Sequence, residues 1–179
     1  MKTKLILLLF IIALTTTNLR AADFTVNDIA YSITSASAPY TVAVSKKSPI
    51  YAGMVTIPNV VSYNSISYSV TSIAERTFQS CTGLTAVTIP NSITSVGRYA
   101  FDNCIGLTSV ILPNSITSIA SYTFDGCTGL TSVTIPNSIT SIGASAFNGC
   151  TGLAAVIIPN SVTYLGDYAF DGCTGLTSV

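Results

Sequence analysis

The five cysteines of this chain are separated by equal intervals of 23 residues, and this regularity restricts the possible folds more than any other feature. They are Cys81, Cys104, Cys127, Cys150 and Cys173. A phenylalanine stands three positions before each of them, at Phe78, Phe101, Phe124, Phe147 and Phe170. Self-similarity at a fixed period of about 20 to 50 residues is typical of a solenoid, in which each repeat forms one coil of a stack.

Each repeat also contains the pattern of a short β-strand. From Leu84 to Ile89 the first, fourth and sixth positions are apolar, which is the L-x-x-L-x-L pattern of a leucine-rich repeat. Thr88 alternates with apolar neighbours, and the next proline ends the strand because it has no amide hydrogen for the ladder. We expect Gly83 and its equivalents to adopt a positive φ before the strand. The segment that ends in each phenylalanine, such as GRYAF, is expected to form a short helical turn.

A single repeat cannot bury its own apolar face, so the coils should be stable only as a stack. The predicted fold class is a β-rich repeat solenoid of the leucine-rich-repeat type, with a short parallel strand and a short helical turn in each 23-residue coil. It should occupy residues 57–179 as about five coils, the last of them truncated. Because Val179 stands within a strand pattern, this coil is expected to be uncapped, and its end is a candidate for end-to-end contact with another chain.

The repeat resembles a known family. The stretch LTSVTIPNSITSIGASAFNGCTGL at 130–153 is similar, nearly letter for letter, to the BspA-like leucine-rich repeats of bacterial and protozoan surface proteins. The likeness covers residues 57–179, and it is more specific for the fold than for the ligand. It implies a secreted or cell-surface protein that acts as an adhesin toward host matrix proteins or other cells.

The residues before the solenoid do not follow the repeat. Residues 1–21 have a basic start, the apolar run LILLLFIIAL and a small-residue end, which is the layout of a cleaved signal peptide. An uncleaved amphipathic anchor is the alternative. VNDIAYSITS at 26–35 and YNSISYSVTS at 63–72 share an alternating pattern, and both are expected to be strands. We predict that residues 22–56 form an N-terminal β cap over the first coil.

The composition argues against several functional classes. The chain has no histidine, which is the commonest general base and metal ligand. Lys2, Lys4 and Arg20 lie in the leader, so four basic and seven acidic residues remain, and no basic surface for nucleic acid is expected. No second long apolar run follows the leader, so no membrane span is expected. We predict that the protein is not an enzyme and needs no cofactor or metal.

Two internal columns follow from the period. The cysteines are expected to be buried free thiols that act as small hydrophobic groups, with disulfides or metal binding as the alternatives. The second column consists of Gln79, Asp102, Asp125, Asn148 and Asp171. Its carboxylates would suit acid–base chemistry on sugars or a weak Ca²⁺ site, but a solvated polar edge is favoured because acids alternate with amides.

Two exposed columns are candidate partner-binding surfaces. One holds three tyrosines, and rigid, amphipathic tyrosines are good protein-contact residues unless they merely cover the phenylalanines. Its members are Arg76, Tyr99, Tyr122, Ser145 and Tyr168. The other is the outer strand face, which either binds protein or glycan or simply faces solvent. It carries Thr85, Thr108, Thr131 and Thr177 in one line and Thr88, Ile111, Thr134 and Ile157 in the next.

These observations favour a secreted or surface-displayed module that binds extracellular or host matrix proteins. The alternative is a structural spacer that displays a downstream domain.

Overall fold

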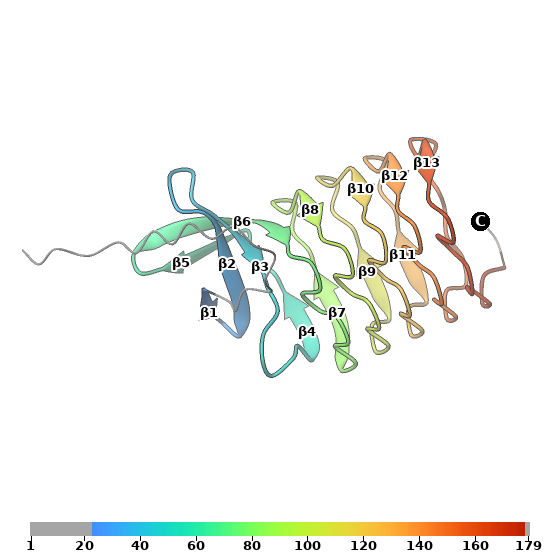
Figure 1. Ribbon diagram of the computed structural model, residues 1–179, viewed down its shortest axis with the longest axis horizontal. Coiled ribbons are helices and arrows are strands. Elements are labelled where there is room, and N and C mark those ends of the chain that lie inside the picture. Colours follow the sequence, from blue (N-terminus) through green and yellow to red (C-terminus); the bar gives the residue numbers. More distant parts are fainter. Residues whose placement is uncertain (1–22, 178–179) are drawn as a thin grey trace, which may run out of the picture.

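The structure is a computed structural model that describes residues 23–177, and it consists of a curved sheet followed by a row of stacked coils (Figure 1). Within this range it contains thirteen strands and no helix. No segment of residues 23–177 therefore forms a helix long and apolar enough to cross a membrane. The expected signal peptide at residues 1–21 lies outside the described residues.

The N-terminal sheet has the strand order β1-β2-β3-β6-β5. Its strands are β1 (Phe24–Val26), β2 (Ile29–Ser35), β3 (Thr41–Val44), β5 (Val60–Tyr63) and β6 (Ile66–Ile73). The two stretches predicted as strands from their shared pattern are therefore confirmed as β2 and β6. Residues 60–73 were expected in the first coil, but β6 pairs with the cap strand β3, with β5 and with β8 (Ser95–Val96).

The shared pattern has a structural cause, because each copy belongs to a hairpin with a two-residue turn. Asn27 and Asp28 connect β1 to β2 with φ values of 48° and 63°. Asn64 and Ser65 connect β5 to β6 with the same pair of values. Two successive positive φ angles match the right-handed twist of the flanking strands, and Asn tolerates this conformation better than most residues.

Parallel strands join the coils, as predicted. One row is a four-stranded parallel sheet of β4 (Gly53–Thr56), β7 (Leu84–Thr88), β9 (Ser109–Ile111) and β11 (Ser132–Thr134). The other row contains β8 and the sheet of β10 (Ser118–Ile119), β12 (Ser141–Ile142) and β13 (Tyr164–Leu165). Figure 1 shows the two rows on opposite sides of the stack.

The expected short helical turn is absent from the coils described, and consecutive tight turns take its place. The amide of Thr77 donates to the carbonyl of Ala74 at 3.4 Å, and that of Gln79 donates to Arg76 at 3.3 Å. Arg76 and Ser80 have φ values of 57° and 59°. A left-handed residue cannot continue a right-handed helix, so the chain reverses direction at each of these positions.

A stack of phenylalanine rings runs through the core. Consecutive ring centroids are 5.0, 5.2, 5.2 and 5.1 Å apart, with interplanar angles of 3° to 10°. Phe78, Phe101, Phe124 and Phe147 are fully buried, and Phe170 in the last coil is partly buried. Such aromatic pairs add about 0.5–1.5 kcal/mol each beyond the burial of their surface.

Tyr51 connects the N-terminal sheet to this stack. Its ring lies 4.7 Å from that of Phe78, measured between centroids. Its hydroxyl accepts a hydrogen bond from the amide of Ala30 at 3.0 Å and donates one to the carbonyl of Ser45 at 2.8 Å. Tyr51 stands outside the 23-residue spacing, so the sequence analysis did not identify it.

The glycine that precedes each strand is required for close packing and not for a positive φ, which corrects our expectation. A Cβ atom on Gly129 would lie 2.3 Å from the carbonyl oxygen of Ile105 in the preceding coil. Gly83 differs, because its Cβ would meet only the Cβ of Ala52, at 3.3 Å. Coils can approach each other closely at Gly129 only if no side chain separates their backbones.

This difference gives a matched pair of substitutions at one repeat position. We expect Gly129→Ala to lower the free energy of unfolding by about 1–3 kcal/mol, since the added methyl group forces two coils apart. Gly83→Ala should cost clearly less, because its nearest neighbour is the methyl group of Ala52. Urea unfolding of both variants measures the difference. Equal losses would contradict the close-packing explanation.

Candidate protein-binding surfaces

The tyrosine column (Arg76, Tyr99, Tyr122, Ser145 and Tyr168) lies at one corner of the coils. All five residues have φ between 54° and 61°. The left-handed conformation is uncommon outside glycine and asparagine, and here it recurs once in each coil. Because the backbone is the same at each position, the five side chains leave successive coils at equivalent places. The sequence predicted the column but contained no signal for its backbone conformation.

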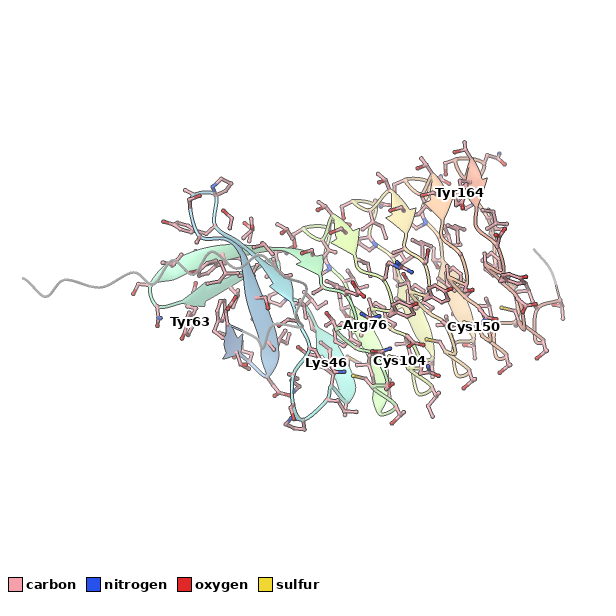
Figure 2. All side chains as sticks on the ribbon, viewed as in Figure 1. Lys46, Tyr63, Arg76, Cys104, Cys150 and Tyr164 are labelled. Carbon is pink, nitrogen blue, oxygen red and sulfur yellow. The ribbon has the colours of Figure 1, made fainter. Side chains whose placement is uncertain are left out.

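The first part of this column is a stack of flat groups. The rings of Tyr99 and Tyr122 are 4.7 Å apart at an interplanar angle of 9°. The guanidinium carbon of Arg76, which Figure 2 labels, lies 4.7 Å from the ring centroid of Tyr99. Arg98 lies 5.6 Å from the Tyr99 ring and 5.9 Å from the Tyr122 ring. Cation–π contacts of this kind contribute about 0.5–1 kcal/mol each at exposed sites.

The second part of the column is different. Ser145 replaces the tyrosine of its coil and is only 7% exposed, whereas Tyr168 in the next coil is 71% exposed. Tyr99 and Tyr122 are of intermediate exposure. The column therefore presents one largely exposed aromatic ring and two partly exposed ones.

The outer face of the β4-β7-β9-β11 sheet exposes large apolar side chains. Ile111 is 72% exposed and lies in register with Thr88 and Thr134. Ile157, which is 83% exposed, stands at the equivalent position of the next repeat. Met54, which is 73% exposed, extends this face onto β4. The sequence analysis missed Met54 because it assigned that residue to the cap.

Three threonines of this face donate their hydroxyl hydrogens to the preceding coil. Thr131 Oγ1 donates to the carbonyl of Thr108 at 3.0 Å, and Thr108 Oγ1 donates to that of Thr85 at 3.4 Å. Thr177 makes the same bond to Ala154 at 3.2 Å. These hydroxyls link neighbouring coils, so a ligand would meet mainly their methyl groups and lone pairs.

The acidic column is a hydrogen-bonded seam. Asp102 is buried and accepts hydrogen bonds from Gln79 Nε2 at 2.8 Å and Asn103 Nδ2 at 2.7 Å. Asp125 accepts one from Asn148 Nδ2 at 3.1 Å. Burial, and then the charge of Asp102, raise the pKa of Asp125. Residues 23–177 contain no group of three or more acidic or cysteine side chains placed to hold a metal ion.

The cysteines are free thiols, and they do more than fill space. Each of the last four donates a hydrogen bond to a phenylalanine carbonyl in the preceding coil; Cys104 reaches Phe78 at 3.0 Å and Cys150 reaches Phe124 at 3.1 Å. Figure 2 shows Cys104 and Cys150 within the stack. Burial raises the pKa of all five thiols, that of Cys150 to about 12. They therefore stay protonated near neutral pH.

A hollow of about 300 Å³ lies beside the β1–β2 turn. Val26, Ile29, Pro58 and Val60 contribute to its walls, and no charged side chain lines it. Because it offers no acid, base or nucleophilic thiol, its chemistry is limited to apolar and neutral polar contacts. It was not apparent in the sequence, since its walls come from separate hairpins.

Stacked coils that are joined by parallel strands and closed by tight turns define a leucine-rich repeat solenoid. Residues 59–177 match the model of the BspA type leucine rich repeat region in six copies, against the about five coils expected. The chain belongs to this family.

Solved structures show the same fold. A leucine-rich repeat protein from Bacteroides ovatus is 36% identical, with a TM-score of 0.79 over 88% of this chain and 40% of its own. A leucine-rich repeat protein from T. pallidum is 27% identical, with a TM-score of 0.72 over 83% of this chain and 66% of its own. The chain thus spans less than two thirds of either relative. None of the curated proteins matches it.

The raised pKa of Asp125 predicts how stability changes with pH. The free energy of unfolding should fall as pH rises from the ordinary value of 3.8 through the higher folded pKa, because the folded state resists ionisation. Asp125→Asn removes the free-energy cost of ionising this carboxyl group, and Asn148 shows that the acidic column accepts an amide. Thermal unfolding should show the variant to be more stable than the wild type near pH 7, but not near pH 3.

Asp171→Asn, which removes an exposed charge from the same column, is the control for a general charge effect. A gain from Asp125→Asn that is equal at both pH values would contradict the explanation.

The thiols should differ in reactivity. In the folded protein, iodoacetamide should modify Cys173 first, since it alone is partly exposed, and should leave the four buried thiols intact. Mass spectrometry after labelling near pH 8 measures this, and unfolding in guanidinium chloride should make all five reactive. Rapid native labelling of Cys127 would contradict the buried, protonated state.

Proposed function

We propose that this chain is a secreted or cell-surface binding module that adheres to host matrix proteins or other cells through the tyrosine column. The observation that carries the proposal is the exposure of Tyr168, at 71%, in line with the stacked rings of Tyr99 and Tyr122. Tyrosine supplies a large, amphipathic contact area at low entropic cost, and it is enriched among residues that dominate binding energy.

The architecture supports binding in this manner. Leucine-rich repeat domains in general mediate protein–protein interactions, and a solenoid presents similar contacts at regular intervals on an extended surface. Contacts that are weak one at a time reinforce each other when they are held in such an array. The leader-like sequence at residues 1–21 supports an extracellular location.

The outer strand face is the second candidate surface within the same function. Ile111 and Ile157 expose apolar area that a partner could cover, and the face carries no charge. A spacer that holds another domain away from the cell is the competing function. It is supported by the regular bonds between coils, including the threonine and cysteine ladders, which favour a stiff rod.

The test compares two sets of substitutions that the repeat itself accepts. Tyr99→Ser, Tyr122→Ser and Tyr168→Ser together copy Ser145, which occupies the same column with the same φ. Ile111→Thr and Ile157→Thr together copy Thr88 and Thr134. Surface plasmon resonance would measure binding of each protein, residues 22–179, to immobilised fibronectin and fibrinogen.

We expect the triple tyrosine variant to bind at least about tenfold more weakly, because aromatic anchors carry most of the binding energy. The double isoleucine variant should bind like the wild type. Circular dichroism and thermal unfolding verify that both variants fold. The reverse pattern would move the site to the strand face, and an absence of binding by all three proteins would favour the spacer.

A further inference from the structure

We infer that the interval between Tyr122 and Tyr168 receives an arginine side chain of a protein partner; this inference rests on the proposed function and names the chemistry of its site. The starting point is an irregularity in the tyrosine column. Its flat groups follow one another from Arg76 to Tyr122, and then Ser145 leaves one coil without a ring.

The backbone defines the size of the interval. The amide of Tyr122 donates to the carbonyl of Ala144 at 3.0 Å, and that of Ser145 donates to the carbonyl of Asp167 at 2.9 Å. The coils that carry Tyr122 and Tyr168 are thus two bonded steps apart, or about 10 Å at the spacing of adjacent strands. Among residues 23–177, the ring-to-ring contacts of this column end at Tyr122. One flat group fits between two such rings at the distance that separates Tyr99 from Tyr122.

The chain itself shows which groups pack in this column. At Tyr99, one neighbour is the ring of Tyr122 and another is the guanidinium group of Arg76. Arg98 lies beside both rings at once, at 5.6 and 5.9 Å. A partner's guanidinium group would contact the rings of Tyr122 and Tyr168 as Arg98 contacts the rings of Tyr99 and Tyr122.

The residues beside the interval are short or acidic. The positions equivalent to Arg98 in the later coils are Ser121, Ala144 and Asp167. Two of these side chains are small, and the third is an exposed carboxylate next to Tyr168. Ser145 is only 7% exposed, so the partner's group would contact the rings and the carboxylate and not the serine hydroxyl.

The charge of the later coils favours a cation over a neutral aromatic ring. Residues 99–177 contain four aspartates and no basic residue, whereas Arg76 and Arg98 both precede Tyr99. The aspartates are Asp102, Asp125, Asp167 and Asp171. No arginine of the solenoid is available for the second half of the column. A planar, weakly hydrated guanidinium stacks on aromatic rings better than the compact ammonium of lysine does.

The test uses a short acetylated peptide, Gly-Gly-Arg-Gly-Gly-amide, and its counterparts with lysine or citrulline at the centre. Proton–carbon NMR of protein labelled in its tyrosine rings follows the titration. We expect the arginine peptide to shift the ring signals of Tyr122 and Tyr168 and to bind several-fold more tightly than either counterpart. Asp167→Asn should weaken the binding, and added salt should do the same.

A matched pair of substitutions locates the site. Ser145→Tyr fills the interval with the residue that the column uses elsewhere, and we expect it to weaken binding of the arginine peptide by about tenfold. Ser141→Tyr is the control, because it adds a tyrosine to the same coil where the paired strand already carries Tyr164. It should bind the peptide like the wild type.

Unchanged binding to the Ser145→Tyr variant, or an equal loss in both variants, would overturn the inference. So would equal affinity for the arginine and lysine peptides. Loss of fibronectin binding in the triple tyrosine variant but not in Ser145→Tyr would leave the proposed function standing and remove only the arginine site. Peptide binding at the interval without binding to any matrix protein would support the site and contradict the proposed host matrix partners.

Discussion

Hydrogen bonds between successive coils are the interaction on which the rest of this structure depends. A coil cannot satisfy its own backbone alone. Amides beside the strands, such as that of Thr131, donate to the preceding coil, and amides in the turns donate to the next one. Phe78 donates to Ala100 and Phe124 donates to Ala146, both at 2.8 Å. The thiol of each later cysteine forms a bond in the opposite direction, to the coil before it. Because these bonds recur with one period, every residue that takes part in them must recur as well.

This requirement separates the positions that repeat from those that vary. The phenylalanine and cysteine positions touch the same residue type in the neighbouring coils, so they are identical in all five repeats. The arginine and tyrosine side chains of the tyrosine column lie at the surface, and the hydrogen bonds that join this column to the next coil use backbone groups, such as the amide of Tyr122 and the carbonyl of Ala144. The column can therefore change from arginine to tyrosine to serine without breaking the stack. At such surface positions one coil can differ chemically from the next.

The limits of prediction from the sequence follow the same division. Equal spacing was sufficient to predict parallel strands, buried phenylalanines and one column of thiols. It did not predict the left-handed residues at Arg76 and Ser80, because neither residue type signals that conformation, and so a helical turn was wrongly expected. The sequence also did not show why a glycine is needed at position 129. The atom that excludes a side chain there belongs to Ile105, 24 residues earlier in the chain.

The hydrogen bonds between coils also determine which surface groups remain available to bind a partner. The sequence suggested a hydroxyl-rich strand face, but the hydroxyls of Thr108, Thr131 and Thr177 on that face already donate to the preceding coil. A glycan or polar protein surface would have to compete with bonds that hold the coils together. An aromatic ring does not have this restriction, because a ring that stacks on a neighbour with one face keeps its other face available to a partner. Among residues 23–177, Tyr168 is the most exposed aromatic residue; it comes directly after Asp167 in the sequence, and its coil follows the one that lacks a flat group in the tyrosine column.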